Sequence, residues 1–140
     1  MTLETTDKTT NLRAWLHSVV ALMAGFAAVV VASLAADTVF HALGVYPPGR
    51  EPMNEVGDNL LALSYRCVFG ALGSYIAARL APSRPMTHAM ILGAIGTAVA
   101  ALGVAATWNL DLGPHWYPIA LAVTALPCAW IGGVVGTRRR

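Results

Sequence analysis

The sequence predicts an all-α membrane protein, a bundle of four transmembrane helices, and three observations support this fold class. The chain of 140 residues is 56% hydrophobic and only 11% charged, against roughly 25% charged residues in soluble domains. Its mean hydropathy is +0.60, and its apolar residues fall into four long runs that lack the polar face of a soluble helix. Short segments rich in proline and glycine separate the runs.

The first apolar run covers about residues 14–46 and follows a polar segment, residues 1–13, that predicts a flexible tail. A helix needs roughly 20 apolar residues to cross a bilayer, so the first helix should tilt or protrude. A cleavable signal peptide is the alternative. Lys8 and Arg13 would form its basic start, and residues 33–35 resemble a cleavage site of small residues, although the run is long for such a signal.

The next three helices are expected at about residues 58–81, 86–108 and 115–136, followed by a basic end at residues 138–140. Asp58 or Asn59 suits the start of the second helix, because side-chain oxygens there accept hydrogen bonds from free backbone N–H groups. The short turn after the second helix makes the second and third helices antiparallel neighbours. Pro127 should kink the fourth helix, which membrane helices tolerate. Residues 14–137 thus form one transmembrane domain.

Basic residues indicate how the bundle is oriented. With four spans, most of them lie on one side: Lys8, Arg13, Arg79, Arg84, Arg138, Arg139 and Arg140. Only Arg50 lies on the other side, so the positive-inside rule predicts that both termini are cytoplasmic. The opposite side receives an aromatic belt of Tyr46, Trp108, Trp116 and Tyr117. No basic stripe with interleaved aromatic residues occurs, which excludes nucleic acid as a partner.

Two full charges interrupt the apolar runs at similar depth. Asp37 lies nine residues before the expected end of the first helix, and Arg66 lies eight residues after Asp58. At 1.5 Å per residue these positions are roughly 13 and 12 Å from the same side of the bundle. An unpaired charge at a helix centre costs about 2.5–3.5 kcal/mol on insertion scales, so we expect an Asp37–Arg66 ion pair. Ser33 and His41 share the face of Asp37 and join this candidate cluster.

Small residues on three helices predict close packing, because membrane helices approach one another where side chains are small. On the second helix they share the face of Arg66: Ala62, Gly70, Gly73 and Ala77. The third helix offers Gly93, Gly96, Ala100, Gly103 and Thr107, and the fourth offers Thr124, Cys128, Gly132 and Gly136. A homo-oligomer formed through Gly132 and Gly136 is the alternative to packing within the chain.

Three functional interpretations remain open. The first is a structural or accessory protein, with lipid and an unknown membrane protein as partners, whose ion pair fixes the helix register. The second is a small transporter or proton-coupled permease using Asp37 and His41, since ionisable residues inside membranes often mark ion pathways. The third is a membrane enzyme or metal site on the outer face. Its candidates are scattered over three segments, although metal ligands must converge: His41, Glu55, Asp58, Asp111 and His115.

The residues favour the view that the chain is not an enzyme, and they predict no catalytic residue, cofactor or bound metal. Cys67 and Cys128 both lie inside apolar runs and have no CxxC spacing. We interpret them as small buried thiols.

The chain resembles small, functionally uncharacterised four-helix proteins of the bacterial inner membrane. The pattern that carries the resemblance consists of Asp37, a proline-rich connection, Tyr65–Arg66 and residues 77–89. The resemblance covers the first three helices and implies an architecture without an activity. The size of the chain is also similar to that of small multidrug transporters, which carry an essential acidic residue on the first helix. Asp37 departs from their pattern because it lies toward the end of a long helix and faces an arginine.

Overall fold

The computed structural model describes the backbone of residues 2–49, 51–110 and 113–139, and the side chains of these residues from residue 9 onward. Within these ranges the chain forms four α-helices and no strand: α1 (Thr2–Ala42), α2 (Val56–Leu80), α3 (Pro85–Thr107) and α4 (Trp116–Arg138). Each helix contains a segment long and apolar enough to cross a membrane, which in α1 is Thr9–Ala42. The predicted class, a bundle of four membrane-spanning helices, is confirmed.

The bounds of α1 differ most from those expected from the sequence. The helix already begins at Thr2, within the segment expected to be a flexible tail, because extending an existing helix needs no new nucleation. It ends at Ala42 and not near residue 46, since Gly44 adopts a positive φ of 69° and caps the helix as C-terminal glycines commonly do. At 1.5 Å per residue α1 is roughly 60 Å long, about twice the thickness of a bilayer core.

Helix α2 is central to the bundle, because α1, α3 and α4 all pack against it. The closest approaches lie at glycines. A Cβ atom on Gly25 of α1 would overlap the backbone of Gly73 on α2, and a Cβ on Gly132 of α4 would overlap the backbone of Ala71. The small-residue faces expected from the sequence thus pack within one chain, as membrane helices do.

Gly132 and Gly136 are both buried against α2 of the same chain. Both take part in the internal α2–α4 contact, and a homo-oligomer formed through them stays a prediction.

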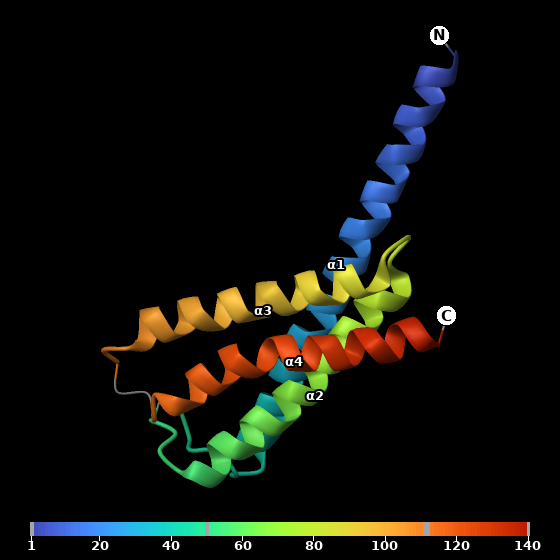
Figure 1. Ribbon diagram of the computed structural model, residues 1–140. Helices are drawn as coiled ribbons and strands as arrows, with labels where there is room; N and C mark the ends of the chain where they lie inside the picture. The colour runs from blue at the N-terminus through green and yellow to red at the C-terminus, as the bar shows by residue number, and fades with distance from the viewer. Residues whose placement is uncertain (1, 50, 111–112, 140) are drawn as a thin grey trace.

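The two ends of the bundle differ in packing. We call the end at the α2–α3 connection, residues 81–84, the turn end, and the end that carries the α1–α2 and α3–α4 connections the connection end. At the turn end the helices converge, and both chain termini lie on this side, with the N-terminal half of α1 projecting past the bundle (Figure 1). Most of the buried apolar residues lie there: Ala77, Ala78, Ala81, Ala89, Leu92 and Ala129.

At the connection end the helices diverge (Figure 1). The two connections meet there, since a Cβ atom on Gly113 would lie 2.8 Å from the carbonyl oxygen of Met53. A pocket lies between the helices at this end, and Asp37 and Arg66 are among the residues that line it.

Candidate functional site

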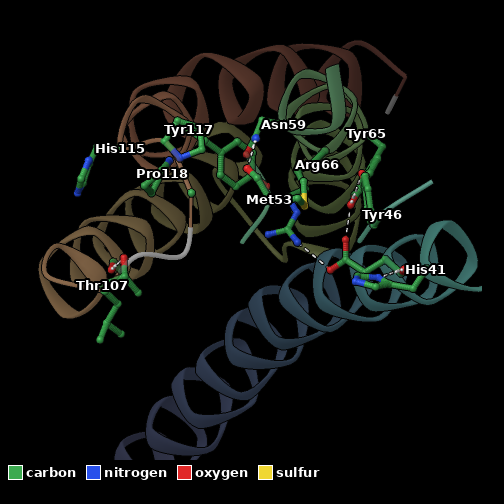
Figure 2. A pocket seen from close by; sticks show the side chains of 16 residues that line it. His41, Tyr46, Met53, Asn59, Tyr65, Arg66, Thr107, His115, Tyr117 and Pro118 are labelled. Atoms are coloured by element: carbon green, nitrogen blue, oxygen red, sulfur yellow. Dashed lines mark hydrogen bonds and ion pairs between the residues drawn. The ribbon is translucent and has the colours of Figure 1, made fainter. Parts of the chain in front are cut away.

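An ion pair joins α1 to α2. The Arg66 guanidinium donates a hydrogen bond from Nη2 to Oδ2 of Asp37 at 2.7 Å, and the Tyr65 hydroxyl donates to the other carboxylate oxygen, Oδ1 (Figure 2). The side chains of Arg66 and Asp37 are 34% and 26% exposed, so the pair is half-buried. Asp37 sits about one turn from the end of α1 and Arg66 in the third turn of α2, so the antiparallel course of the two helices brings them to the same depth.

Tyr46 extends the network toward the connection end. Its side chain is buried, and its hydroxyl donates to the Tyr65 hydroxyl at 3.3 Å. The ring of Phe40 lies 5.4 Å from Tyr46 and 5.6 Å from Tyr65. Burial raises the pKa of Tyr46 above its ordinary value, which keeps its hydroxyl a neutral donor. A chain of hydrogen bonds thus runs from Tyr46 through Tyr65 to Asp37.

Sequence reasoning missed the roles of both tyrosines. The sequence predicts an interfacial aromatic belt that includes Tyr46 and Tyr117, whereas in the structure Tyr46 turns inward and Tyr117 is half-buried at the pocket described below. The adjacency of Tyr65 to Arg66 was the available signal, since a buried tyrosine hydroxyl usually seeks a polar partner.

The other members of the predicted cluster have different surroundings. His41 is exposed, and its Nδ1 lies 2.7 Å from the backbone oxygen of Asp37 one turn earlier, while its ring packs edge-on against Tyr46 at 5.3 Å. It therefore supports the end of α1 and does not contact the carboxylate. Ser33 lies one turn on the other side of Asp37 and lines the inner cavity.

The polar candidates of the connection end do not gather at one point. The Nε2 of His115 donates to the Trp108 carbonyl over 2.9 Å, and His115 lies across the pocket from His41 (Figure 2). Glu55 is exposed at the start of α2, and Asp58 is half-buried in its first turn. Asp111 lies outside the described residues. Among the residues that are described, no three His, Cys, Asp or Glu side chains converge in a way that could hold a metal.

Asn59 has a role other than the predicted helix cap. Its buried amide nitrogen donates to the carbonyl of Met53 at 2.7 Å and to that of Glu55 at 2.9 Å. The side chain therefore ties the α1–α2 connection to α2, and this fixes one wall of the pocket.

Two cavities meet at the ion pair. The connection-end pocket has a volume of about 340 Å³, and its lining includes polar side chains: His41, Tyr46, Asn59, Tyr65, Thr107 and Tyr117. The inner cavity has a volume of about 370 Å³, lies between all four helices and is mainly apolar, with Val29, Val30, Leu34, Leu92, Val99 and Leu121 in its walls. Asp37 and Arg66 line both. The charged pair thus stands at the boundary between a polar and an apolar space.

The Arg66 guanidinium has hydrogen-bond donors that its partners do not use. Its Nε is buried without a hydrogen-bond partner among the described residues, and the centre of its guanidinium lies 6.0 Å from the centroid of the Tyr65 ring. Tyr117 lines the connection-end pocket together with Arg66. Cys67 and Cys128, both free thiols, border the inner cavity just beyond the pair.

No family model matches the chain, and no curated protein or solved structure matches it. The site therefore has to be interpreted from its own geometry.

Proposed function

We propose that the protein is a small accessory protein of the bacterial inner membrane in which the Asp37–Arg66 pair fixes α1 on the core of α2, α3 and α4. One observation carries the proposal. Within the described residues α1 packs on α2 and on part of α3 and makes no packing contact with α4. Besides this packing, which is closest where Gly25 meets Gly73, the hydrogen bonds that Asp37 accepts from α2 join the two helices.

Energetics support a structural role for the pair. A lone Asp or Arg at a helix centre costs about 2.5–3.5 kcal/mol on insertion scales. Removing one partner of a buried pair leaves the other charge uncompensated, which costs more than removing both. The pair therefore favours the alignment of α1 against α2 in which Asp37 contacts Arg66.

A double-mutant cycle tests the structural role. Asp37→Asn and Arg66→Leu should each destabilise the fold, and the double variant should recover much of the loss, with a coupling energy of about 0.5–3 kcal/mol. The measurement is the free energy of unfolding in detergent micelles followed by circular dichroism. Ser64→Ala is the control, because Ser64 is exposed on α2 and bonds only to the carbonyl of Leu60 within the described residues. Additive effects of the two charge substitutions would disprove the structural role.

The proposed orientation places both termini in the cytoplasm and rests on the positive-inside rule. Fusions at the C-terminus test it. A C-terminal fluorescent protein that folds only in the cytoplasm should fluoresce. A C-terminal phosphatase that is active only in the periplasm should remain inactive. The reverse result would contradict the orientation.

A proton-coupled permease using Asp37 and His41 is the second candidate, favoured by the position of the pair between two cavities and by the Tyr46–Tyr65–Asp37 hydrogen bonds. In liposomes carrying a pH-sensitive dye, this function predicts a proton flux that Asp37→Asn abolishes while the variant stays folded. A flux equal in both proteins would exclude a role of Asp37 as proton carrier.

A further inference from the structure

The inner cavity is open toward the lipid side of the bundle. Three of its lining side chains are also well exposed: Val30 and Leu34 of α1 by 38% and 60%, and Val99 of α3 by 55%. The cavity therefore continues to the surface between α1 and α3, two helices that pack on each other over only a small part of their length (Figure 1). In a membrane that surface meets acyl chains, so an apolar molecule could enter sideways.

The polar end of the cavity has more hydrogen-bond donors than acceptors. The Asp37 carboxylate already accepts from Tyr65 and Arg66, one bond on each oxygen. Arg66 has five N–H donors, donates one of them to Asp37 and leaves its Nε without a partner in the described part of the chain. The Tyr117 hydroxyl, which makes no hydrogen bond to any described residue, belongs to the connection-end pocket on the other side of the ion pair. An acidic group is the complement of these donors.

We propose that the inner cavity binds one single-chain amphiphile with a carboxylate head, which enters between α1 and α3, with its chain in the cavity and its head at Arg66. A guanidinium pairs with a carboxylate through two parallel hydrogen bonds. The volume of about 370 Å³ lies at the lower end of the range of small-molecule sites, roughly 300–1,000 Å³, and suits one chain better than a two-chain lipid. This inference names a ligand and does not depend on the accessory role proposed above.

The ligand head and Asp37 then compete for the same guanidinium. Neutralising Asp37 removes the competitor and leaves Arg66 free for the ligand, so Asp37→Asn should bind more tightly than the natural chain. A purely structural ion pair predicts no such gain.

The test uses the full chain in phosphatidylcholine nanodiscs, with native mass spectrometry to count bound molecules. Dodecanoate is the probe. Dodecanol has the same chain without the acid, and acetate has the acid without the chain. We expect one saturable dodecanoate per protein and at least tenfold weaker binding of dodecanol and acetate.

Two neighbouring alanines provide a matched pair of variants. Ala100 lines the cavity, whereas Ala101 is exposed and does not line it. Ala100→Phe should fill the cavity and weaken dodecanoate binding at least tenfold, and Ala101→Phe should change it less than twofold. Thermal melts check that both variants fold.

The charge variants decide the head-group assignment independently. Asp37→Asn should tighten dodecanoate binding at least threefold, and the double variant Asp37→Asn with Arg66→Leu should abolish it. The double variant carries no uncompensated charge at this site, so loss of binding there is separable from loss of the fold. The stability cycle of the accessory role is measured without ligand, so either proposal can fail without the other.

Four results would overturn the inference. Equal binding of dodecanol would show that Arg66 does not recognise the head, and unchanged binding by Ala100→Phe would place the chain elsewhere. In discs containing phosphatidylglycerol, a bound lipid that dodecanoate cannot displace would assign the cavity to a resident membrane lipid. A dimer that Ala100→Phe dissociates would assign it to a second copy of the chain.

Discussion

The turn end and the connection end of the bundle show opposite ways of packing membrane helices. At the turn end glycine and alanine allow backbones to meet: Cβ atoms on Gly73, Gly93 or Gly132 would overlap atoms of the neighbouring helix. At the connection end no described neighbour of Gly57 or Gly103 comes within 4 Å of such a Cβ position. There, charged and aromatic side chains and the connection-end pocket lie between the helices, and the inner cavity extends from the ion pair toward Leu92 and Gly93.

The two ends therefore contribute differently to the stability of the bundle. Without a hydrophobic driving force between helices in lipid, association depends on close van der Waals packing, which the turn end supplies. The connection end is then free to hold groups that pack poorly, such as Arg66 with its unpaired Nε. Functional residues are expected where the structure tolerates such unsatisfied groups.

The largest effect is expected from Gly132→Ala at the turn end. A methyl group there would overlap the backbone of Ala71 and the amide nitrogen of Tyr75, and backbone cannot rotate away. We expect a loss of about 3 kcal/mol or more, the upper end of overpacking costs, measured as the unfolding free energy in micelles. A loss below about 1 kcal/mol would show that α2 and α4 do not pack this closely.

The same comparison explains what the sequence could and could not predict. Apolar runs and small-residue faces are local properties, so the four helices and their small-residue faces follow from spacing, whereas the pairing of α2 with α4 does not. The matched depths of Asp37 and Arg66 also follow, because helix rise converts residue number into height. The hydrogen bonds from Tyr65 and Tyr46 did not follow, since the inward turn of Tyr46 depends on where Gly44 ends α1.

The two cavities could not be predicted from the sequence, because they also depend on how the helices are arranged. Sequence shows which residues share a helix face, and Gly96, Ala100 and Thr107 do share one. Whether a small-residue face is filled by a neighbouring helix or left open depends on how far helices diverge along their length. Only the arrangement of α1 against α3 determines that.

Disulfide cross-linking tests how close α2 and α4 are between the tightly packed turn end and the open connection end. Cys67 of α2 and Cys128 of α4 both border the inner cavity and lie close enough to interact. Oxidation by copper phenanthroline and dissolved oxygen should remove one hydrogen from each thiol and form an internal disulfide, detected by mass spectrometry after proteolysis. Cys67→Ser is the control. Failure to cross-link, or cross-links only between chains, would show that α2 and α4 are already apart at this depth.

A smaller effect is expected at the connection end from Tyr65→Phe. The change removes the hydrogen bond to the Asp37 carboxylate. Bonds to charged groups contribute more than neutral ones, and partial exposure of Asp37 reduces the value, so we expect a loss of about 1–2 kcal/mol. The unfolding free energy measures it, and no loss would mean that Arg66 alone satisfies the carboxylate.

Tyr46→Phe should cost less, about 0.5 kcal/mol, because its bond to the Tyr65 hydroxyl is long and neutral. The pKa of Tyr46 is raised from 10.0 by burial, so the folded state retains a proton that the unfolded state loses. The stability from this group is therefore present below about pH 10 and declines above it. Tyr46→Phe should remove that part of the alkaline decline, and an identical pH profile in both proteins would contradict the burial of this hydroxyl.

The smallest effect, and one of opposite sign, is expected from Gly103→Ala. Gly103 lies in α3 at the wall of the connection-end pocket, and an added Cβ would meet no atom of the described neighbouring segments within 4 Å. Because alanine loses less backbone entropy than glycine in a helix, we expect a gain of about 0.5–1 kcal/mol in unfolding free energy. The same Gly→Ala change would then destabilise at residue 132 and stabilise at residue 103. A loss at both positions would show that the connection end packs as closely as the turn end and that the pocket is closed in the membrane.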